Sequence, residues 1–116
     1  MRRVFTWGPP VVWMALIFYT SSQPDPVPAV TRAVWDKLLH LGGYVALAML
    51  FARALRAEGV SAATASILAA LLASAYGATD EVHQLFVPLR HSDVRDWIAD
   101  SIGAVIGAAI YGARRL

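Results

Sequence analysis

The sequence predicts an all-α fold: an integral membrane bundle of four transmembrane helices, built as one domain over residues 1–116, with both termini cytoplasmic. The chain is 58% hydrophobic and 16% charged, whereas soluble domains are nearer half apolar and a quarter charged. It contains long uncharged runs, such as Val4–Tyr19 and Ala62–Ala78. A membrane span needs about 20 mainly apolar residues, so 116 residues leave room for about four spans with short connections.

The first predicted span covers residues 4–20 and follows the basic pair Arg2-Arg3. Pro9 and Pro10 lie near its start, where proline is tolerated or introduces a kink. A cleaved signal peptide is the alternative for this segment, but no A-x-A-like site follows the apolar core directly. We therefore favour a retained span.

The other predicted spans cover residues 37–55, 62–84 and 96–112. A proline-containing loop and a short interfacial helix, residues 29–35, are expected before the second span. The third span should continue through Gln84 and end before Pro88. In the fourth span, Gly103 and Gly107 belong to a series of small residues that favours close helix contact in lipid.

Charge is distributed unequally between the two predicted ends of this bundle. The end with both termini holds six basic residues against one acidic residue, Glu58. The opposite end holds four basic residues, seven acidic residues and all three histidines. Because basic residues concentrate on the cytoplasmic side of membrane proteins, the acidic end is predicted to face away from the cytoplasm. Nearly every residue able to transfer a proton or bind a metal then lies on that outer side.

One candidate site lies at the start of the second span. Asp36, His40 and Tyr44 are spaced four residues apart and therefore share one helix face. In the functional interpretation, His40 is a general base oriented by Asp36, with the Tyr44 phenol close by. In the structural alternative, the three side chains form a polar network that fixes helix packing. His40 is also a candidate pH sensor.

A second polar group consists of Asp80, Glu81 and Gln84 at the end of the third span, with Asp96 and Asp100 at the start of the fourth. Its carboxylate and amide oxygens are ligands that hard divalent cations favour, and His40 or His83 would also admit zinc. The alternative is ion pairing with Lys37 and Arg90, which are also candidates for binding phosphate. The alternative for these two cations is contact with lipid headgroups or anchoring of the helix ends. Ser21 and Ser22 are interpreted as turn residues.

From the residues we predict catalytic roles for Asp36, His40 and Glu81, substrate binding by Lys37, Tyr44, Gln84 and Arg90, and metal binding by Asp80, Asp96 and Asp100. A divalent cation is the candidate cofactor, and its identity stays open. The chain has no cysteine, which excludes a thiolate ligand or nucleophile. The basic residues are explained by membrane orientation, so no nucleic-acid partner is expected.

Four segments resemble the VanZ-like family in order and spacing. They are Ser21-Ser22-Gln23-Pro24, Asp36-Lys37-x-x-His40-x-x-x-Tyr44, Asp80-Glu81-x-x-Gln84-x-Phe86-x-Pro88-x-Arg90 and Asp96-x-x-x-Asp100-x-x-Gly103. The resemblance implies a small multi-pass protein of the bacterial cytoplasmic membrane, in a family associated with resistance to the glycopeptide teicoplanin. Asp100 departs from the asparagine that is common at this position. An amide is no general base, so the resemblance assigns no proton-transfer role there.

Together these observations predict a protein that acts on a membrane lipid or a lipid-linked or phosphorylated cell-envelope molecule, either as a hydrolase or as a transferase. A non-catalytic protein that binds such a lipid or an antibiotic target is the alternative. A small ion or proton pathway is the third interpretation, suggested by ionisable residues inside the spans. The oligomeric state stays open.

Overall fold

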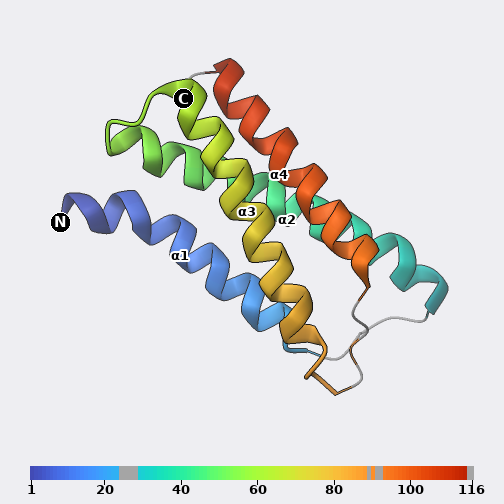
Figure 1. The fold of residues 1–116 in the computed structure, drawn as a ribbon. Helices are drawn as coiled ribbons and strands as arrows, with labels where there is room; N and C mark the ends of the chain where they lie inside the picture. Colours follow the sequence, from blue (N-terminus) through green and yellow to red (C-terminus); the bar gives the residue numbers. More distant parts are fainter. Residues whose placement is uncertain (24–28, 89, 91–92, 115–116) are drawn as a thin grey trace.

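The computed structural model is all-helical, as predicted, and the residues that it describes contain four helices and no strand. It describes residues 1–23, 29–88, 90 and 93–114, and side chains for 1–23, 37–88, 90 and 93–113. The helices are α1 (Arg2–Ser21), α2 (Ala29–Ala57), α3 (Ala62–Gln84) and α4 (Val94–Arg114). Successive helices run in alternating directions (Figure 1).

Helix boundaries follow the sequence signals closely, with one difference. Helix α3 begins after Ser61, whose hydroxyl accepts a hydrogen bond from the Thr64 backbone N–H, and it ends at Gln84 as predicted. The segment 29–35 is not a separate interfacial helix but the first two turns of α2, which has 29 residues in all. No proline or glycine interrupts residues 29–41, so the helix continues.

The two prolines of α1 are accommodated inside the helix. Proline has no backbone N–H, so Pro9 leaves the Phe5 carbonyl without its usual intrahelical donor. The Arg53 guanidinium of α2 donates to that carbonyl at 3.3 Å. A side chain of the neighbouring helix thus restores the hydrogen bond that proline removes, which also attaches α1 to α2.

The core lies between α2, α3 and α4 and consists largely of small residues. Leu47, Ala48, Ala69, Ala73 and Ala104 are fully buried. Small side chains let helix backbones approach closely, which is the main source of helix association in lipid. The closest approach joins α2 to α4 at Gly103 and Gly107. A Cβ on these glycines would lie 2.4 Å and 2.2 Å from the carbonyl oxygens of Leu41 and Val45.

Helix α1 packs on the outside of this three-helix core and makes no close backbone contact with α4 in the described part of the chain. Two side-chain hydrogen bonds hold its middle. The Trp13 indole donates to the Gly43 carbonyl at 2.9 Å, and the Tyr76 hydroxyl donates to the Met14 carbonyl at 2.7 Å. No atom packs closely against the Cα of Gly43 on the side where a Cβ would stand, because a Cβ there would meet nothing within 4 Å.

Two helical segments are long and apolar enough to cross a membrane, Lys37–Ala57 of α2 and Ala62–Gln84 of α3. Only 39% and 22% of their most apolar windows are buried inside the protein. Many large apolar side chains, such as Ile67 and Leu71, therefore point outward. Helices α1, with its two prolines, and α4, with Asp96 and Asp100, are not among these two candidates.

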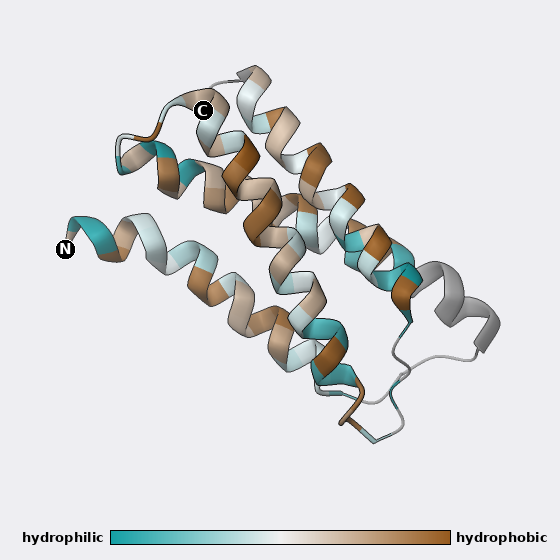
Figure 2. Ribbon diagram, in the orientation of Figure 1, coloured by the Kyte–Doolittle hydropathy of each residue, from teal (hydrophilic) through white to brown (hydrophobic). Residues whose placement is uncertain are grey.

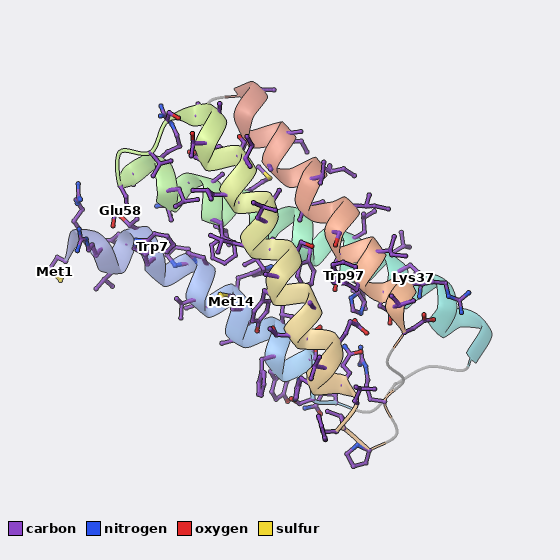
Figure 3. The ribbon with its side chains drawn as sticks, viewed as in Figure 1. Met1, Trp7, Met14, Lys37, Glu58 and Trp97 are labelled. Atoms are coloured by element: carbon purple, nitrogen blue, oxygen red, sulfur yellow. The ribbon has the colours of Figure 1, made fainter. Side chains whose placement is uncertain are left out.

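Hydrophilic residues gather at the two ends of the bundle, with apolar stretches between them (Figure 2). At one end, Glu58 pairs with Arg2 at 3.2 Å and accepts a hydrogen bond from the Trp7 indole at 3.3 Å. These contacts place the start of α1 beside the end of α2, while Lys37 lies at the opposite end (Figure 3). The basic and acidic ends predicted from the sequence are therefore separate in space.

Candidate functional site

Eight polar or charged residues are buried among the described side chains, and seven of them lie toward the end of the bundle where α1 and α3 stop and α4 begins. These seven form the cluster described below. Charged side chains are rarely buried unless they have partners, so the cluster marks a candidate functional site. Its members are Ser21, His40, Asp80, Glu81, Gln84, Asp96 and Asp100.

The centre of the cluster is a pair formed by His40 of α2 and Asp100 of α4. Nδ1 of His40 lies 2.5 Å from Oδ1 of Asp100, and both side chains are buried. A carboxylate on Nδ1 holds the imidazole in one orientation and one tautomer, with Nε2 left for chemistry. The sequence assigned this orienting role to Asp36, whose side chain lies outside the described residues. The structure shows Asp100 in that position.

Asp96, one turn before Asp100 on α4, lies on the other side of the imidazole. Its Oδ2 is 3.9 Å from Nε2 of His40, and its Oδ1 pairs with the ammonium of Lys37. The Asp96 side chain is 5% exposed and that of Lys37 is 39% exposed. The ion pair thus reaches from the buried cluster to the surface of the bundle.

Glu81 approaches the same imidazole from α3. Its Oε2 accepts a hydrogen bond of 3.2 Å from the backbone N–H of Asp93, just before α4. The Asp93 side chain accepts a hydrogen bond from the Arg95 backbone N–H at 2.9 Å and so caps α4. Hydrogen bonds to Arg95 and the charge of Arg95 hold the pKa of the partly exposed Asp93 carboxyl below its usual range. The turn before α4 therefore positions Glu81.

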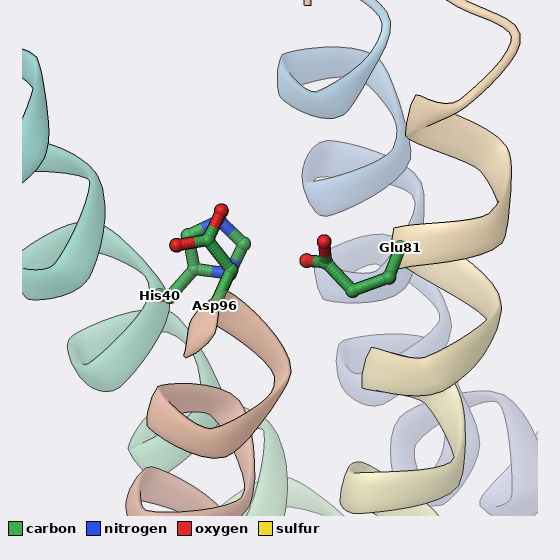
Figure 4. A group of neighbouring side chains, drawn as sticks. All are labelled: His40, Glu81 and Asp96. Atoms are coloured by element: carbon green, nitrogen blue, oxygen red, sulfur yellow. The ribbon is translucent and has the colours of Figure 1, made fainter. Parts of the chain in front are cut away.

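One ligand atom from each of His40, Glu81 and Asp96 lies within 4.8 Å of the others, and all three residues are buried. Figure 4 shows the Glu81 carboxylate directed toward the other two side chains, which stand side by side on α2 and α4. An imidazole nitrogen with two carboxylates is a donor set that divalent metals accept. Of Asp80, Asp96 and Asp100, the residues assigned to metal binding from the sequence, only Asp96 belongs to this trio. His40 and Glu81 were assigned catalytic roles.

Asp80 lies deeper along α3 and has contacts of its own. Its carboxylate accepts a hydrogen bond from the Gln84 amide at 3.4 Å and another from the buried Ser21 hydroxyl at the end of α1. The predicted metal ligand Asp80 and the predicted substrate-binding residue Gln84 are therefore partners of each other. Ser21, interpreted from the sequence as a turn residue, is part of the cluster.

Tyr44 extends the cluster toward the core from one turn after His40. The side chain is 2% exposed, and its hydroxyl has no hydrogen-bond partner among the described residues. The same is true of Oε1 of Gln84 and Oδ2 of Asp100, both on fully buried side chains. Buried polar atoms normally have partners, so these three atoms mark the cluster as a place where water, an ion or another ligand can bind.

The two cations predicted to bind phosphate make internal contacts. Lys37 pairs with Asp96, as described above. Arg90 donates to the carbonyl oxygens of Thr20 and Gln23, at 3.4 Å and 3.3 Å, and so joins the loop after α3 to the end of α1. Helix ends expose unpaired carbonyls, and a basic side chain satisfies them. Phosphate binding by either residue stays a prediction.

Two further residues shape the site, although sequence reasoning did not single them out. Gly77 faces Asp100, and a Cβ at this position would lie 2.9 Å from Oδ2 of Asp100. Gly77 therefore lets the carboxylate reach the α3 backbone. Asp93 holds Glu81 through its backbone N–H. The sequence gives no sign of the Asp93 contact, because any residue type except proline could supply the backbone N–H. Gly77 was detectable, because it lies four residues after Ala73 and continues a stripe of small residues on α3.

Comparison with known protein families gives a match over nearly the whole chain. Neither a curated protein nor a solved structure matches the sequence. The VanZ/LLP1 family description matches residues 7–115, which include helices α2 to α4, most of α1 and every residue of the polar cluster. The chain therefore belongs to the VanZ/LLP1 family.

Proposed function

We propose that this chain crosses the bacterial cytoplasmic membrane four times, at about residues 4–20, 37–55, 62–84 and 96–112, as a single domain with both termini inside. The polar cluster then faces the outer leaflet and acts on a lipid-linked or phosphorylated envelope molecule. Membership of the VanZ/LLP1 family supports a link to glycopeptide resistance. The action on lipid is the function that the geometry of the cluster supports best.

The buried His40–Asp100 pair is the observation that carries this proposal. A histidine that donates Nδ1–H to a carboxylate presents an unprotonated Nε2, which is the form a general base needs. In the proposed reaction, Nε2 removes a proton from a water molecule or from a hydroxyl of the substrate. Asp100 stabilises the imidazolium that forms, and the proton then passes to the leaving group.

The surroundings of the Lys37–Asp96 pair suit a lipid substrate. Lys37 is partly exposed, and beside it on α2 Leu38 and Leu39 are 52% and 61% exposed. Across the pair, on α4, Val94 and Ile98 are also exposed. A lipid could therefore keep its tails against the apolar surface while its anionic headgroup meets Lys37. Gln84 and Tyr44 remain the proposed substrate contacts deeper in the cluster, and Arg90 the contact nearest the loops.

The distribution of charge supports the proposed orientation. The end held together by Arg2, Arg53 and Glu58 is the basic one, and basic residues concentrate on the cytoplasmic side. The cluster lies at the other end. Asp36 falls at that end by its place in α2, so a contribution to substrate binding or to the orientation of His40 remains part of the proposal.

A non-catalytic binding protein is the second candidate. It is favoured by the exposed apolar surface beside Lys37, at Leu38 and Leu39, which suits lipid binding and needs no proton transfer by His40. The ion-pathway interpretation gains no such support. Toward the basic end, the described core between α2, α3 and α4 consists of residues such as Leu47, Phe51 and Ala69 and offers no continuous polar path.

Mass spectrometry of lipids tests the proposal. Purified wild-type protein, His40→Gln and His83→Gln would be incubated with total envelope lipids. His83 is the matched control, since it stacks on Phe18 at 4.2 Å outside the His40–Glu81–Asp96 trio. We expect a lipid product with wild type and His83→Gln and none with His40→Gln. Equal product from all three proteins would refute His40 as the base. A co-purified lipid without turnover would favour the binding protein.

A further inference from the structure

We infer that His40, Glu81 and Asp96 form a binding site for one divalent transition-metal cation of the Zn²⁺ or Mn²⁺ class. The three residues come from α2, α3 and α4, and one ligand atom of each lies within 4.8 Å of the other two. Metal–ligand bonds of about 2.1 Å place neighbouring ligands about 3.0–3.4 Å apart in octahedral or tetrahedral geometry. Closing the trio around an ion therefore requires each ligand atom to move by up to about 1 Å.

The donor set selects the class of metal. Mg²⁺ and Ca²⁺ favour sites made of oxygen alone, whereas an imidazole nitrogen suits first-row transition metals and zinc. Three protein ligands also leave room for a water or a substrate atom on the ion, as in catalytic metal sites. The proposed ion would supply Lewis acidity at the point where His40, Glu81 and Asp96 meet.

The contact between His40 and Asp100 is the arrangement expected behind a metal-bound histidine. Histidines that bind metal usually donate their other ring N–H to a carboxylate or a carbonyl, which fixes the tautomer and the direction of the ligating nitrogen. Nδ1 of His40 is engaged by Asp100 at 2.5 Å, and Nε2 lies on the side of Asp96, 3.9 Å from its Oδ2. Asp100 is thus a positioning residue rather than a ligand.

Unpartnered buried atoms next to the trio independently indicate a ligand. Gln84 follows Glu81 by three positions, so the two side chains share a face of α3, and Tyr44 follows His40 by four on α2. Oε1 of Gln84, the Tyr44 hydroxyl and Oδ2 of Asp100 are buried without a hydrogen-bond partner among the described residues. Oxygens in this state are accommodated by a cation or by water bound to it.

The charge of the cluster suits a divalent cation. Asp80, Glu81, Asp96 and Asp100 are each no more than 8% exposed. Among the described cations, Lys37 contacts Asp96, and Arg90 lies near enough to act on Asp80 electrostatically. Carboxylates gathered in a buried site are unfavourable unless cations or protons neutralise them. A divalent ion between Glu81 and Asp96 would lower this cost.

Lys37 provides a test that misfolding cannot imitate. Its ammonium shares the Asp96 carboxylate with the proposed ion, so the two cations compete for one ligand. Lys37→Met keeps the length and the apolar stem of the side chain but removes the competitor. If the metal site exists, this variant binds the ion more tightly than wild type.

The experiment measures binding of Zn²⁺ and Mn²⁺ alone to chelator-treated full-length protein in detergent, by calorimetry and by the electron paramagnetic resonance of Mn²⁺. We expect one ion per chain in wild type, with affinity lowered at least 100-fold in Glu81→Gln and about 10- to 100-fold in Asp100→Asn. Lys37→Met should gain about tenfold. His83→Gln, the control, should match wild type.

Circular dichroism of each variant distinguishes loss of metal binding from loss of the helical fold. Absence of stoichiometric binding in folded wild-type protein would overturn the inference, and so would equal affinity in wild type, Glu81→Gln and Lys37→Met. The inference changes one step of the proposed function, because an Nε2 that binds the ion cannot also take up a proton; with the ion bound, its Lewis acidity would activate the water instead. Bound metal without lipid turnover would leave the site standing and retire the enzyme. Turnover that persists in metal-free protein would keep His40 as the base and exclude the ion from the reaction.

Discussion

Nδ1 of His40 and Oδ1 of Asp100 lie 2.5 Å apart across the interface of α2 and α4, although the residues are 60 positions apart in the chain. The contact joins the helices just beyond the glycines that let them approach. Gly103 follows Asp100 by one turn, and its missing Cβ leaves room for the backbone of Leu41. Close helix packing and the geometry of the site therefore depend on the same few residues.

Replacement of Asp100 should show how much its carboxylate stabilises the fold as the hydrogen-bond partner of His40. Asp100→Ala leaves the buried His40 without its partner and should lower the free energy of unfolding by about 1–3 kcal/mol. Asp100→Asn keeps an acceptor for Nδ1–H and should cost clearly less. Thermal unfolding in detergent, followed by circular dichroism, measures both. If alanine and asparagine proved equally tolerated, the pair would have no structural role.

Gly107 should tolerate no side chain. A Cβ there would lie 2.2 Å from the Val45 carbonyl oxygen, so Gly107→Ala has to push α4 away from α2, at about 1–3 kcal/mol. Gly42→Ala is the matched control on α2, because a Cβ at Gly42 meets nothing within 4 Å and alanine favours the helix. Equal melting temperatures for the two variants would contradict the packing described here.

Asp93 should stabilise α4 above acidic pH. Its pKa is lower in the folded chain than in a free aspartate, so its contribution is complete above the ordinary aspartate pKa and is lost as the pH falls through the lowered value. Asp93→Ala should therefore reduce the melting temperature at pH 7 and abolish this part of the pH dependence. Asp93→Asn retains a capping oxygen and should remain closer to wild type at pH 7.

The four-span topology predicts opposite sides for Glu58 and Pro88. Reporter fusions that fluoresce or fold only in one compartment should place position 58 in the cytoplasm and position 88 outside. A cytoplasmic reporter at Pro88 would refute an outward-facing site, whether or not the cluster binds metal or lipid. With that result, the proposed access of lipid to the cluster from the outer leaflet would also be wrong.

Sequence alone determined the helices and the location of the polar residues along them. Apolar runs, Pro88 and the Ser61 cap set the limits of α3, because helix length and capping depend on neighbouring residues. The series of small residues in α4 likewise indicated its contact face. The continuity of α2 through residues 29–35 was missed, since an amphipathic stretch after a proline loop is also typical of an interfacial helix.

Only the tertiary structure decided which polar residues meet. Spacing along one helix paired His40 with Asp36, but Asp100 from another helix lies on Nδ1. Sequence reasoning likewise grouped Asp80 with Asp96 and Asp100 as metal ligands. In the structure, His40, Glu81 and Asp96 come together instead. Asp80 lies with Gln84 and Ser21. Periodicity fixes which face of a helix a residue occupies, but the partner across the interface depends on how deeply and at what rotation the helices pack. In this protein glycines at 77, 103 and 107 set that packing.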